Sequence, residues 1–411
     1  MPLIAAIPFL VLIALTCGGA VYYGVVLWRV LKTARTLPTT RDGLTMAAPE
    51  GGWPRVCVVV PAHNEERVIG ELARSLVAQD YPGLRVVFSL DRCTDGTEGV
   101  LRGVCADDPR FEIVRVGSCP EGWAGKTNAA WRGVRDSVGA RDAELLLFAD
   151  ADTVFEPGLV RASVALLLER RLDLLSLLSR LTSEEWFERW VQPAAGFELV
   201  RQYPLDVVNR GVRPRAFANG QFMLFRRGLY DAIGGHERVK DHLLEDIAFA
   251  RYLDIVRKSM PSRWGVLMTD GMLRCRMYRD WDSFRRGWKR IYTEASLRRP
   301  RQLREWARRK RLSGVVLPAA GLVCAAAGPM VMMWDRPLGW TMFGAGVVSV
   351  GVFVVTMARI YVDQGLGAAW ALTYPVGAWR VAGLLDEAAR DLERGVKTLW
   401  GGREYAREVK A

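Results

Sequence analysis

Three long apolar stretches in this 411-residue chain exclude an ordinary soluble fold. Residues 3–28, 313–334 and 337–358 contain no charged side chain. Each has the roughly 20 residues that an α-helix needs to cross the hydrocarbon core of a membrane. A cleaved signal peptide would be shorter than the first stretch and would begin with basic residues. We therefore predict three transmembrane helices, one before and two after the rest of the chain.

The charges beside these stretches predict their orientation. Basic residues lie at 29–35, at 308–311 and at Arg359, whereas the linker 335–336 carries one acid and one base. Because basic flanks stay on the cytoplasmic side, residues 29–312 are predicted to be cytoplasmic in a multi-pass cell-membrane protein. The seven cysteines form no CxxC pair, which indicates a reducing compartment rather than a disulfide framework or a zinc site.

Two further segments are predicted to lie near the membrane. Residues 365–385 are apolar but contain Pro375 and Arg380, so an interfacial or re-entrant helix competes with a fourth crossing. Residues 285–311 contain twelve Lys or Arg, interleaved with aromatic and aliphatic side chains. This pattern predicts an amphipathic helix pair on an anionic leaflet. Basic residues beside the membrane would account for the net charge of +12, so a nucleic acid partner is not expected.

Strand-like and helix-like patterns alternate between the anchors. Strands are predicted at 55–60, 84–90, 111–116 and 144–149, and helices at 66–78, 97–105 and 126–136. Nearly continuous apolar strands separated by helices are typical of a mostly parallel sheet covered on both faces. The predicted fold class is therefore α/β, with ligands at the carboxyl ends of the strands. No GxGxxG follows the first strand, which disfavours a dinucleotide-binding fold.

Polar clusters follow the first two predicted strands. The first strand runs into PAHNEE at 61–66 and the second into DRCTDGT at 91–97. Carboxylates at such positions can accept hydrogen bonds from a nucleotide base or from ribose hydroxyls. Asn64 as a helix N-cap and Asp95 as a turn residue would explain the same clusters without a ligand, and both interpretations stay open.

The loop GWAGKTN at 122–128 places Lys126 at the start of a predicted helix. Backbone N–H groups at a helix N-terminus attract anions, and the lysine adds a positive charge. The spacing GxxxxGK[ST] fails at its first glycine, so the loop is not a P-loop. It is predicted to bind an anion, with a surface lysine as the alternative.

The fourth predicted strand ends in Asp150-Ala151-Asp152. In extended geometry, side chains two residues apart point the same way, so both carboxylates can face one Mg²⁺ or Mn²⁺. Such an ion would bridge the oxygens of a diphosphate. A second D-x-D, Asp280 to Asp282, has no buried strand before it, so the position of the first pair is what favours it as the metal site.

Two acids, Glu245 and Asp246, open a third candidate cluster before an apolar-periodic helix at 247–253. As first-turn acids they could simply favour the helix dipole. The functional interpretation is a general base near an acceptor hydroxyl.

Taken in order, these motifs resemble a family 2 glycosyltransferase of the GT-A fold. The motifs are VVVPAHNEE, LDRCTDGT, GWAGKTNAA, FADADTVF, FANGQFMLFRR, GGHE and LLEDIAFA across residues 55–255, with LWGGREY at 399–405. In character the chain is similar to membrane-anchored glycosyltransferases of the hopanoid-associated and carotenoid types, and less so to ceramide glucosyltransferases.

The resemblance implies a role for each matching residue. Asp91 would contact the nucleotide base, and the stretch with Pro61, Ala62 and Glu65 would line the same pocket. Asp150 and Asp152 would hold the metal and the donor diphosphate, beside Lys126. Asp246, next to Glu245, would be the catalytic base. Acceptor contacts are expected at Asn219, Gly220, Gln221 and Trp288.

Two departures from the family pattern carry information. The paired acids expected after the second strand appear as Leu90-Asp91, and Cys93 replaces a serine, which leaves the preferred donor base open. Processive members carry (Q/R)xxRW, whereas this chain has Gly287 before Trp288. Transfer of a single sugar is therefore expected rather than polymer synthesis.

The predicted protein is an inverting, metal-dependent glycosyltransferase acting on a lipid or lipid-like hydroxyl at the cytoplasmic membrane face. Its partners would be the bilayer, the lipid acceptor and a nucleotide sugar, with UDP expected first. The alternatives are a polyprenyl-phosphate glycosyltransferase, a processive polysaccharide synthase and a non-catalytic scaffold. The predicted domains are an anchor (1–28), a GT-A domain (50–280), a basic interfacial segment (281–312), two transmembrane helices (313–358) and an interfacial helix with a cytoplasmic tail (359–411).

Overall fold

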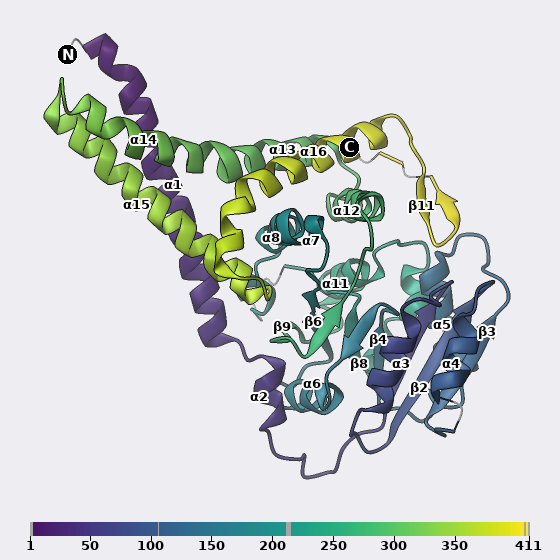
Figure 1. Ribbon diagram of the computed structural model, residues 1–411. Helices are drawn as coiled ribbons and strands as arrows, with labels where there is room; N and C mark the ends of the chain where they lie inside the picture. Colours follow the sequence, from purple (N-terminus) through teal and green to yellow (C-terminus); the bar gives the residue numbers. More distant parts are fainter. Residues whose placement is uncertain (1–2, 106, 211–214, 407, 410–411) are drawn as a thin grey trace.

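The computed structural model describes residues 3–105, 107–210, 215–406 and 408–409. Residues 1–2 of the predicted anchor and 407, 410 and 411 of the predicted tail lie outside the described part. The described chain consists of a domain built on a large sheet, with three long helices projecting from it (Figure 1).

The large sheet has seven strands in the order β3-β2-β1-β4-β8-β6-β9. The strands are β1 (Val56–Ala62), β2 (Leu84–Asp91), β3 (Phe111–Val116), β4 (Leu145–Ala149), β6 (Leu174–Leu178), β8 (Phe222–Arg226) and β9 (Trp264–Met268). The pairs β1–β2, β1–β4, β2–β3 and β6–β9 are parallel, and β8 runs antiparallel to both of its neighbours. The mostly parallel α/β fold predicted from the sequence is confirmed.

Helices cover both faces of this sheet because its strands are apolar on both sides. One face packs on α3 (Ile69–Val77), α4 (Thr97–Cys105) and α6 (Leu159–Glu169). The other packs on α5 (Gly125–Asp136), α10 (Arg227–Ala232) and α11 (Glu245–Val256). The short helix α2 (Thr40–Leu44) lies on α6, and the 3-10 helix η1 (Gly235–Val239) lies beside α5.

The remaining strands form two small sheets. The first is formed by β5 (Thr153–Phe155), β10 (Leu273–Cys275) and β7 (Arg180–Leu181). It begins directly after the Asp150–Asp152 turn and brings Cys275 next to it. The second is an antiparallel hairpin of β11 (Thr398–Trp400) and β12 (Arg403–Tyr405) near the C-terminus.

Three helices in the described part of the chain are long and apolar enough to cross a membrane. They are α1 (Leu3–Thr36), the continuous helix of α13 (Pro300–Arg311), η2 (Leu312–Val316) and α14 (Leu317–Val331), and α15 (Arg336–Asp363). The helices α1, α14 and α15 pack against one another. Figure 1 places the start of α1 and the α14–α15 turn at the same end of this bundle, far from the large sheet.

A further apolar core joins the sheet domain to the bundle. It is built from α7 (Trp186–Trp190), α8 (Gln192–Gln202), α9 (Leu205–Val208), α12 (Trp281–Ala295), α13, α15, η3 (Ala368–Thr373) and α16 (Tyr374–Glu393). The fourth apolar stretch thus forms η3 and α16, and α16 packs along α8, α12 and α13 instead of forming another candidate span.

This core corrects the prediction for the basic segment. The segment does form two amphipathic helices, α12 and α13, but their apolar side chains are buried within the protein, so these faces are not available to a leaflet. Several of the basic side chains pair with acids of α16: Arg285 with Glu387 at 2.7 Å and Lys289 with Asp391 at 2.5 Å. Periodicity predicted the apolar face correctly, but it could not identify α16 as the partner that covers it.

Candidate active site

The carboxyl ends of β1, β2 and β4 open into one cavity of about 1230 Å³. All residues that the sequence analysis selected for the site line this cavity. They are Pro61, Ala62, Glu65, Asp91, Lys126, Asp150, Asp152, Asn219, Gly220, Gln221, Glu245, Asp246 and Trp288. The structure therefore brings together side chains separated by more than 200 positions in the sequence.

Lys126 is the central cation of the cavity. It lies in the first turn of α5, and its Nζ is 2.6 Å from Asp150 Oδ1 and 2.6 Å from Glu245 Oε1. Burial would lower the pKa of Lys126, but the two carboxylates outweigh burial and raise it. Burial would likewise raise the pKa of Glu245, but the charge of Lys126 holds it below its usual value. Lys126 is thus charged and bound within the site, which excludes the alternative of a surface lysine.

Asp246 is held at the N-terminus of α11 by two backbone donors. Gly220 N–H donates to Asp246 Oδ2 at 2.7 Å, and Ile247 N–H donates to Oδ1 at 2.7 Å. Burial, followed by the negative charge of Glu245, raises the pKa of Asp246 to about 7. A carboxylate with a pKa near neutrality can accept a proton from a reacting group and release it again.

Gly220 explains how these charges can lie so close to the backbone. A Cβ at this position would be 3.2 Å from Lys126 Nζ and 3.3 Å from both Asp246 Oδ2 and Glu245 Oε1. A side chain would therefore crowd the three charged groups. The sequence analysis expected Gly220 to contact the acceptor, whereas the structure shows its N–H oriented toward the candidate base.

Asp150 and Asp152 lie in the turn between β4 and β5. Burial and the charge of Asp150 raise the pKa of Asp152 to about 7, so the two carboxylates disfavour each other's ionisation. Asp152 Oδ1 accepts one weak hydrogen bond, from Cys275 Sγ at 3.4 Å. The rival Asp280 has a structural role instead: it caps α12, with Oδ1 accepting from Ser283 N–H at 2.7 Å.

Two carboxylates fit a divalent cation that also binds a substrate. Within the described ranges, no group of three or more His, Cys, Asp or Glu side chains could hold a metal alone. Mg²⁺ commonly takes one or two carboxylates and fills its shell with phosphate oxygens and water. A cation between Asp150 and Asp152 would also relieve their mutual repulsion. The residues present therefore fit a metal bound together with a diphosphate.

The residues predicted to contact the nucleotide lie at and just after the ends of β1 and β2. Asp91 is 2% exposed, and the Arg92 guanidinium donates to both of its oxygens, Nε to Oδ1 at 2.8 Å and Nη2 to Oδ2 at 2.5 Å. Burial, with the charges of Asp152 and Asp150, raises the pKa of Glu65 to about 8. Pro61 and Ala62 are buried at the end of β1.

Two neighbouring polar residues have structural roles, but only one has the role that the sequence left open. Asp95 lies in the turn before α4, as expected, whereas the N-cap of α3 is Val68 and not Asn64. Asn64 Oδ1 accepts a hydrogen bond from Thr94 N–H at 2.8 Å, which ties the loop after β1 to the loop after β2. Asp95 accepts from the N–H groups of Thr97 and Glu66, both at 3.1 Å. These hydrogen bonds hold the loops after β1 and β2 in place, and these loops carry residues predicted to contact the nucleotide.

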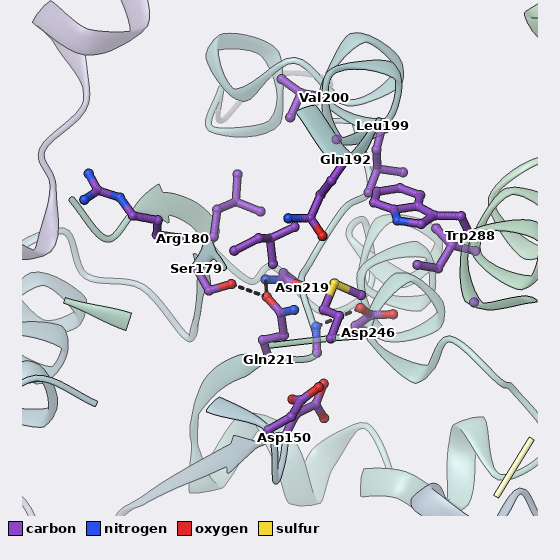
Figure 2. Close-up of a pocket in the computed structure, with 18 of the residues that line it drawn as sticks. Asp150, Ser179, Arg180, Gln192, Leu199, Val200, Asn219, Gln221, Asp246 and Trp288 are labelled. Carbon is purple, nitrogen blue, oxygen red and sulfur yellow. Dashed lines mark hydrogen bonds between the residues drawn. The ribbon is translucent and has the colours of Figure 1, made fainter. Parts of the chain in front are cut away.

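Asn219 and Gln221 form an amide pair that lines the cavity (Figure 2). Gln221 Oε1 accepts from Asn219 Nδ2 at 2.9 Å and from Ser179 Oγ at 2.5 Å. Gln221 Nε2 donates to Cys275 Sγ at 3.1 Å. The chain Gln221–Cys275–Asp152 thus connects the predicted acceptor region with the predicted metal site.

Several residues that line the cavity were not predicted from the sequence. Arg290 of α12 stacks on Trp400 of the C-terminal hairpin, with the guanidinium carbon 3.2 Å from the ring centroid. Tyr405 Oη accepts a hydrogen bond from Gly125 N–H at 3.3 Å, next to Lys126. The aromatic residues around Gly401 and Gly402 were a usable signal, because consecutive glycines with positive φ form a tight hairpin turn.

Comparison with protein families gives one match that covers the sheet domain. Residues 54–292 match the family described as "Glycosyltransferase like family 2". Among curated proteins, the 4,4'-diaponeurosporenoate glycosyltransferase of Staphylococcus aureus strain USA300 is 27% identical over 304 residues, which are 71% of this chain and 71% of the relative. The protein of the same name from strain N315 is 29% identical over 256 residues, covering 59% of this chain and 62% of the relative.

Solved structures give weaker similarities. A mannosyltransferase of Pyrobaculum calidifontis in complex with GDP-Man and Mn²⁺ is 18% identical with a TM-score of 0.45, covering 83% of this chain and 98% of that chain. TarS of Staphylococcus aureus in complex with UDP-GlcNAc is 14% identical with a TM-score of 0.41, covering 86% of this chain and 96% of that chain.

Proposed function

Because the chain belongs to glycosyltransferase-like family 2, we propose that it transfers one sugar from a nucleotide-sugar donor to a lipid hydroxyl, with inversion at the anomeric carbon. Membership confirms the resemblance drawn from the motifs and identifies the protein as a glycosyltransferase. The inverting mechanism, the metal and the lipid acceptor are the parts that are proposed.

One observation carries this proposal: Asp246, Glu245 and Lys126 surround Gly220, and Lys126 also binds Asp150. A candidate base, a fixed cation and the first of the two proposed metal ligands are therefore adjacent in one cavity. A non-catalytic scaffold would not need a carboxylate whose pKa is raised to about 7 beside a charged lysine.

The proposed reaction uses these groups in fixed roles. The acceptor hydroxyl oxygen attacks the anomeric carbon on the face opposite the diphosphate, and Asp246 accepts the hydroxyl proton. As the new C–O bond forms, the bond from the anomeric carbon to the diphosphate oxygen breaks. The Lys126 ammonium, 2.6 Å from Asp150, would stabilise the charge on the departing diphosphate.

Asp150 and Asp152 would hold the divalent cation. When bound, such an ion neutralises the diphosphate and makes it a better leaving group. The weak hydrogen bond from Cys275 leaves most of the acceptor capacity of Asp152 free for this role.

Packing around Gly287 supports transfer of a single sugar. A Cβ at this position would lie 2.1 Å from Tyr278 Oη, so the arginine of the processive motif has no room there. Without that arginine, we propose that the site releases its product after one transfer.

The proposal is tested with membranes that contain the protein. Labelled UDP-glucose, UDP-GlcNAc and GDP-mannose are supplied in turn with Mn²⁺, and the label is followed into the lipid extract. We expect one donor to give a labelled lipid carrying one sugar, and membranes with Asp246→Asn to give almost none. Label found only in a polymer or only in free sugar would contradict the proposal.

The predicted orientation is tested by cysteine labelling of intact cells. Met333, at the α14–α15 turn, is 80% exposed, and Ile255, on α11, is 78% exposed. With the sheet domain in the cytoplasm, a membrane-impermeant thiol reagent should label Met333→Cys in intact cells and Ile255→Cys only after lysis. The wild type, which keeps the native cysteines, gives the background. The reverse pattern would place the sheet domain outside.

A further inference from the structure

The cavity is larger than the donor requires. Small-molecule sites usually occupy about 300–1000 Å³, whereas this cavity has about 1230 Å³. Its donor end is lined by the acids after β1, β2 and β4. Its other end is lined by residues of α1 and α15, which belong to the bundle of candidate membrane helices, and by residues of α8. One continuous space therefore joins the reacting groups to membrane-level helices.

The part of the cavity at this second end, here called the helix-lined arm, has an apolar wall. Its walls include Val26 and Val30 of α1, Leu37 directly after the end of α1, Leu199 and Val200 of α8, and Ile360 of α15. Val26 and Val30 are four positions apart on α1, and Leu37 follows seven positions later, where its N–H still donates to Thr33 O at 3.0 Å, so the three residues form a single stripe along one side of the helix and its end. In Figure 2, Leu199 and Val200 lie on one side of Asp246 and Asp150 lies on the other.

Two ion pairs neutralise charges in the wall of the arm. Arg29 Nη2 is 3.0 Å from Asp206 Oδ1, and Arg359 Nη2 is 2.7 Å from Asp363 Oδ1. Both pairs line the cavity. Arg29 and Arg359 thus have carboxylate partners, whereas Arg180, which also lines the cavity, forms no salt bridge within the described residues, although its charge acts on Asp363. The apolar wall, and not an absence of charge, is therefore the feature that suits a hydrocarbon chain.

A buried donor marks the inner end of the arm. Trp288 is 3% exposed, and its indole Nε1 has no hydrogen-bond partner although it is enclosed by protein. A buried N–H without a partner costs about 1–3 kcal/mol, so a ligand oxygen placed there would be bound favourably. Trp288 lines the cavity and is drawn near Asp246 in Figure 2, where an acceptor oxygen would have to lie.

The arm lies at the height of the lipid headgroups. The apolar helix at 6–36 is about 46 Å long, against roughly 30 Å for a hydrocarbon core, so its last turns extend beyond that core. Arg29, Lys32 and Arg35 occupy these last turns. Lysine and arginine at helix ends reach to the membrane interface, so the stripe from Val26 to Leu37 borders the leaflet on the side of the sheet domain.

We propose that the helix-lined arm binds the hydrocarbon tail of the acceptor lipid, which enters from that leaflet beside α1 while its hydroxyl reaches Asp246 and Trp288. This inference rests on the proposed function and adds to it the place where the tail binds. Each methylene that enters the arm should tighten acceptor binding by about fourfold. Long-chain acceptors should therefore be used far better than short-chain ones.

The test uses two tryptophan substitutions on α1. Val30→Trp fills the arm, whereas Val25→Trp adds the same bulk on a part of α1 that is 50% exposed and absent from the cavity wall. The full-length protein is placed in phosphatidylglycerol and phosphatidylethanolamine vesicles with a hexadecanol that carries a diazirine in its chain. After irradiation, the labelled peptides are mapped by mass spectrometry.

We expect label on residues 26–37 and 196–200 in the wild type and in Val25→Trp, and at least a tenfold loss in Val30→Trp. Unlabelled hexadecanol should compete, and hexanol should not. Hydrolysis of the donor without acceptor should stay within twofold in both variants, which shows that the sheet domain is folded. Equal labelling in the two variants, or label spread over the outer faces of α14 and α15, would overturn the proposal.

This design separates the two proposals. If the arm is labelled as expected but no lipid ever receives sugar, the proposed function fails and the tail site stands. If sugar transfer to lipid is robust in Val30→Trp for every chain length, the tail site fails and the proposed function stands.

Discussion

Replacing Asp246 with asparagine should lower the rate of sugar transfer by roughly 10² to 10⁴, the usual contribution of a general base. The amide cannot accept the hydroxyl proton, while Lys126 and the Asp150–Asp152 pair remain in place. Donor affinity should therefore change little. Asparagine can satisfy only one of the two backbone donors, Gly220 and Ile247, so a stability loss of about 1–3 kcal/mol is also expected. Transfer rate, nucleotide-sugar affinity and thermal unfolding are the three measurements.

Asp282→Asn is the matched control for this change. Asp282 is also a first-turn acid of a helix, α12, but it is absent from the cavity wall. If both variants transfer sugar at nearly the normal rate, Asp246 only favours the start of α11. The alternative with a phosphate acceptor, which needs no base, would then gain support.

The second large effect is expected from Asp152→Ala. Losing one of two metal carboxylates should reduce turnover by roughly 10² to 10³, since a bound cation contributes several kcal/mol to leaving-group stabilisation. EDTA should abolish most wild-type activity, and Mn²⁺ should restore it. In the variant, added Mn²⁺ should no longer tighten donor binding, which is measured by titration calorimetry.

In the metal-free protein, Asp152→Ala is expected to keep or raise the unfolding temperature, although it lowers turnover. The pKa of Asp152 is raised to about 7, so keeping this carboxylate ionised costs folding free energy above its ordinary pKa, and the cost disappears in acid. Without metal, Asp152→Ala should thus unfold at the same or a higher temperature near pH 7.5, with no gain near pH 4. Asp282→Ala should alter neither turnover nor the response to Mn²⁺. Full wild-type activity in EDTA, or an equal loss of turnover in Asp282→Ala, would refute the metal assignment.

Local patterns in the sequence predicted the first half of the sheet domain well. The strands β1 to β4 and helices α4 and α5 lie within two residues of their predicted positions, and α3 begins three residues later. Parallel strands share the edge at which they end, so the clusters after β1, β2 and β4 had to meet. For this reason the donor-end residues, from Pro61 to Asp152, could be placed together from the sequence alone.

The rest of the site depends on pairings that local patterns do not encode. The strand β8 runs antiparallel between β4 and β6, and this reversal places Asn219 and Gly220 beside Asp246. Cys275 reaches Asp152 through the pairing of β10 with β5, across 123 positions. Trp400 reaches Arg290 only because α16 folds back along α12. The resemblance of motifs to a known family indicated Asn219 and Gly220. No motif in the sequence indicated Cys275 or Arg290.

The unbroken helix from Pro300 to Val331 joins the sheet domain rigidly to the bundle of candidate membrane helices. Its first turns are buried among α8, α12 and α16, and its last turns pack on α15, with no flexible linker between the two parts. If the apolar part of this helix crosses a membrane, as proposed, the sheet domain can neither tilt freely nor move away from the bilayer. Asp246 would then lie at a fixed depth relative to the bilayer, and the proposed lipid acceptors would be selected by the position of their hydroxyl group along the bilayer normal.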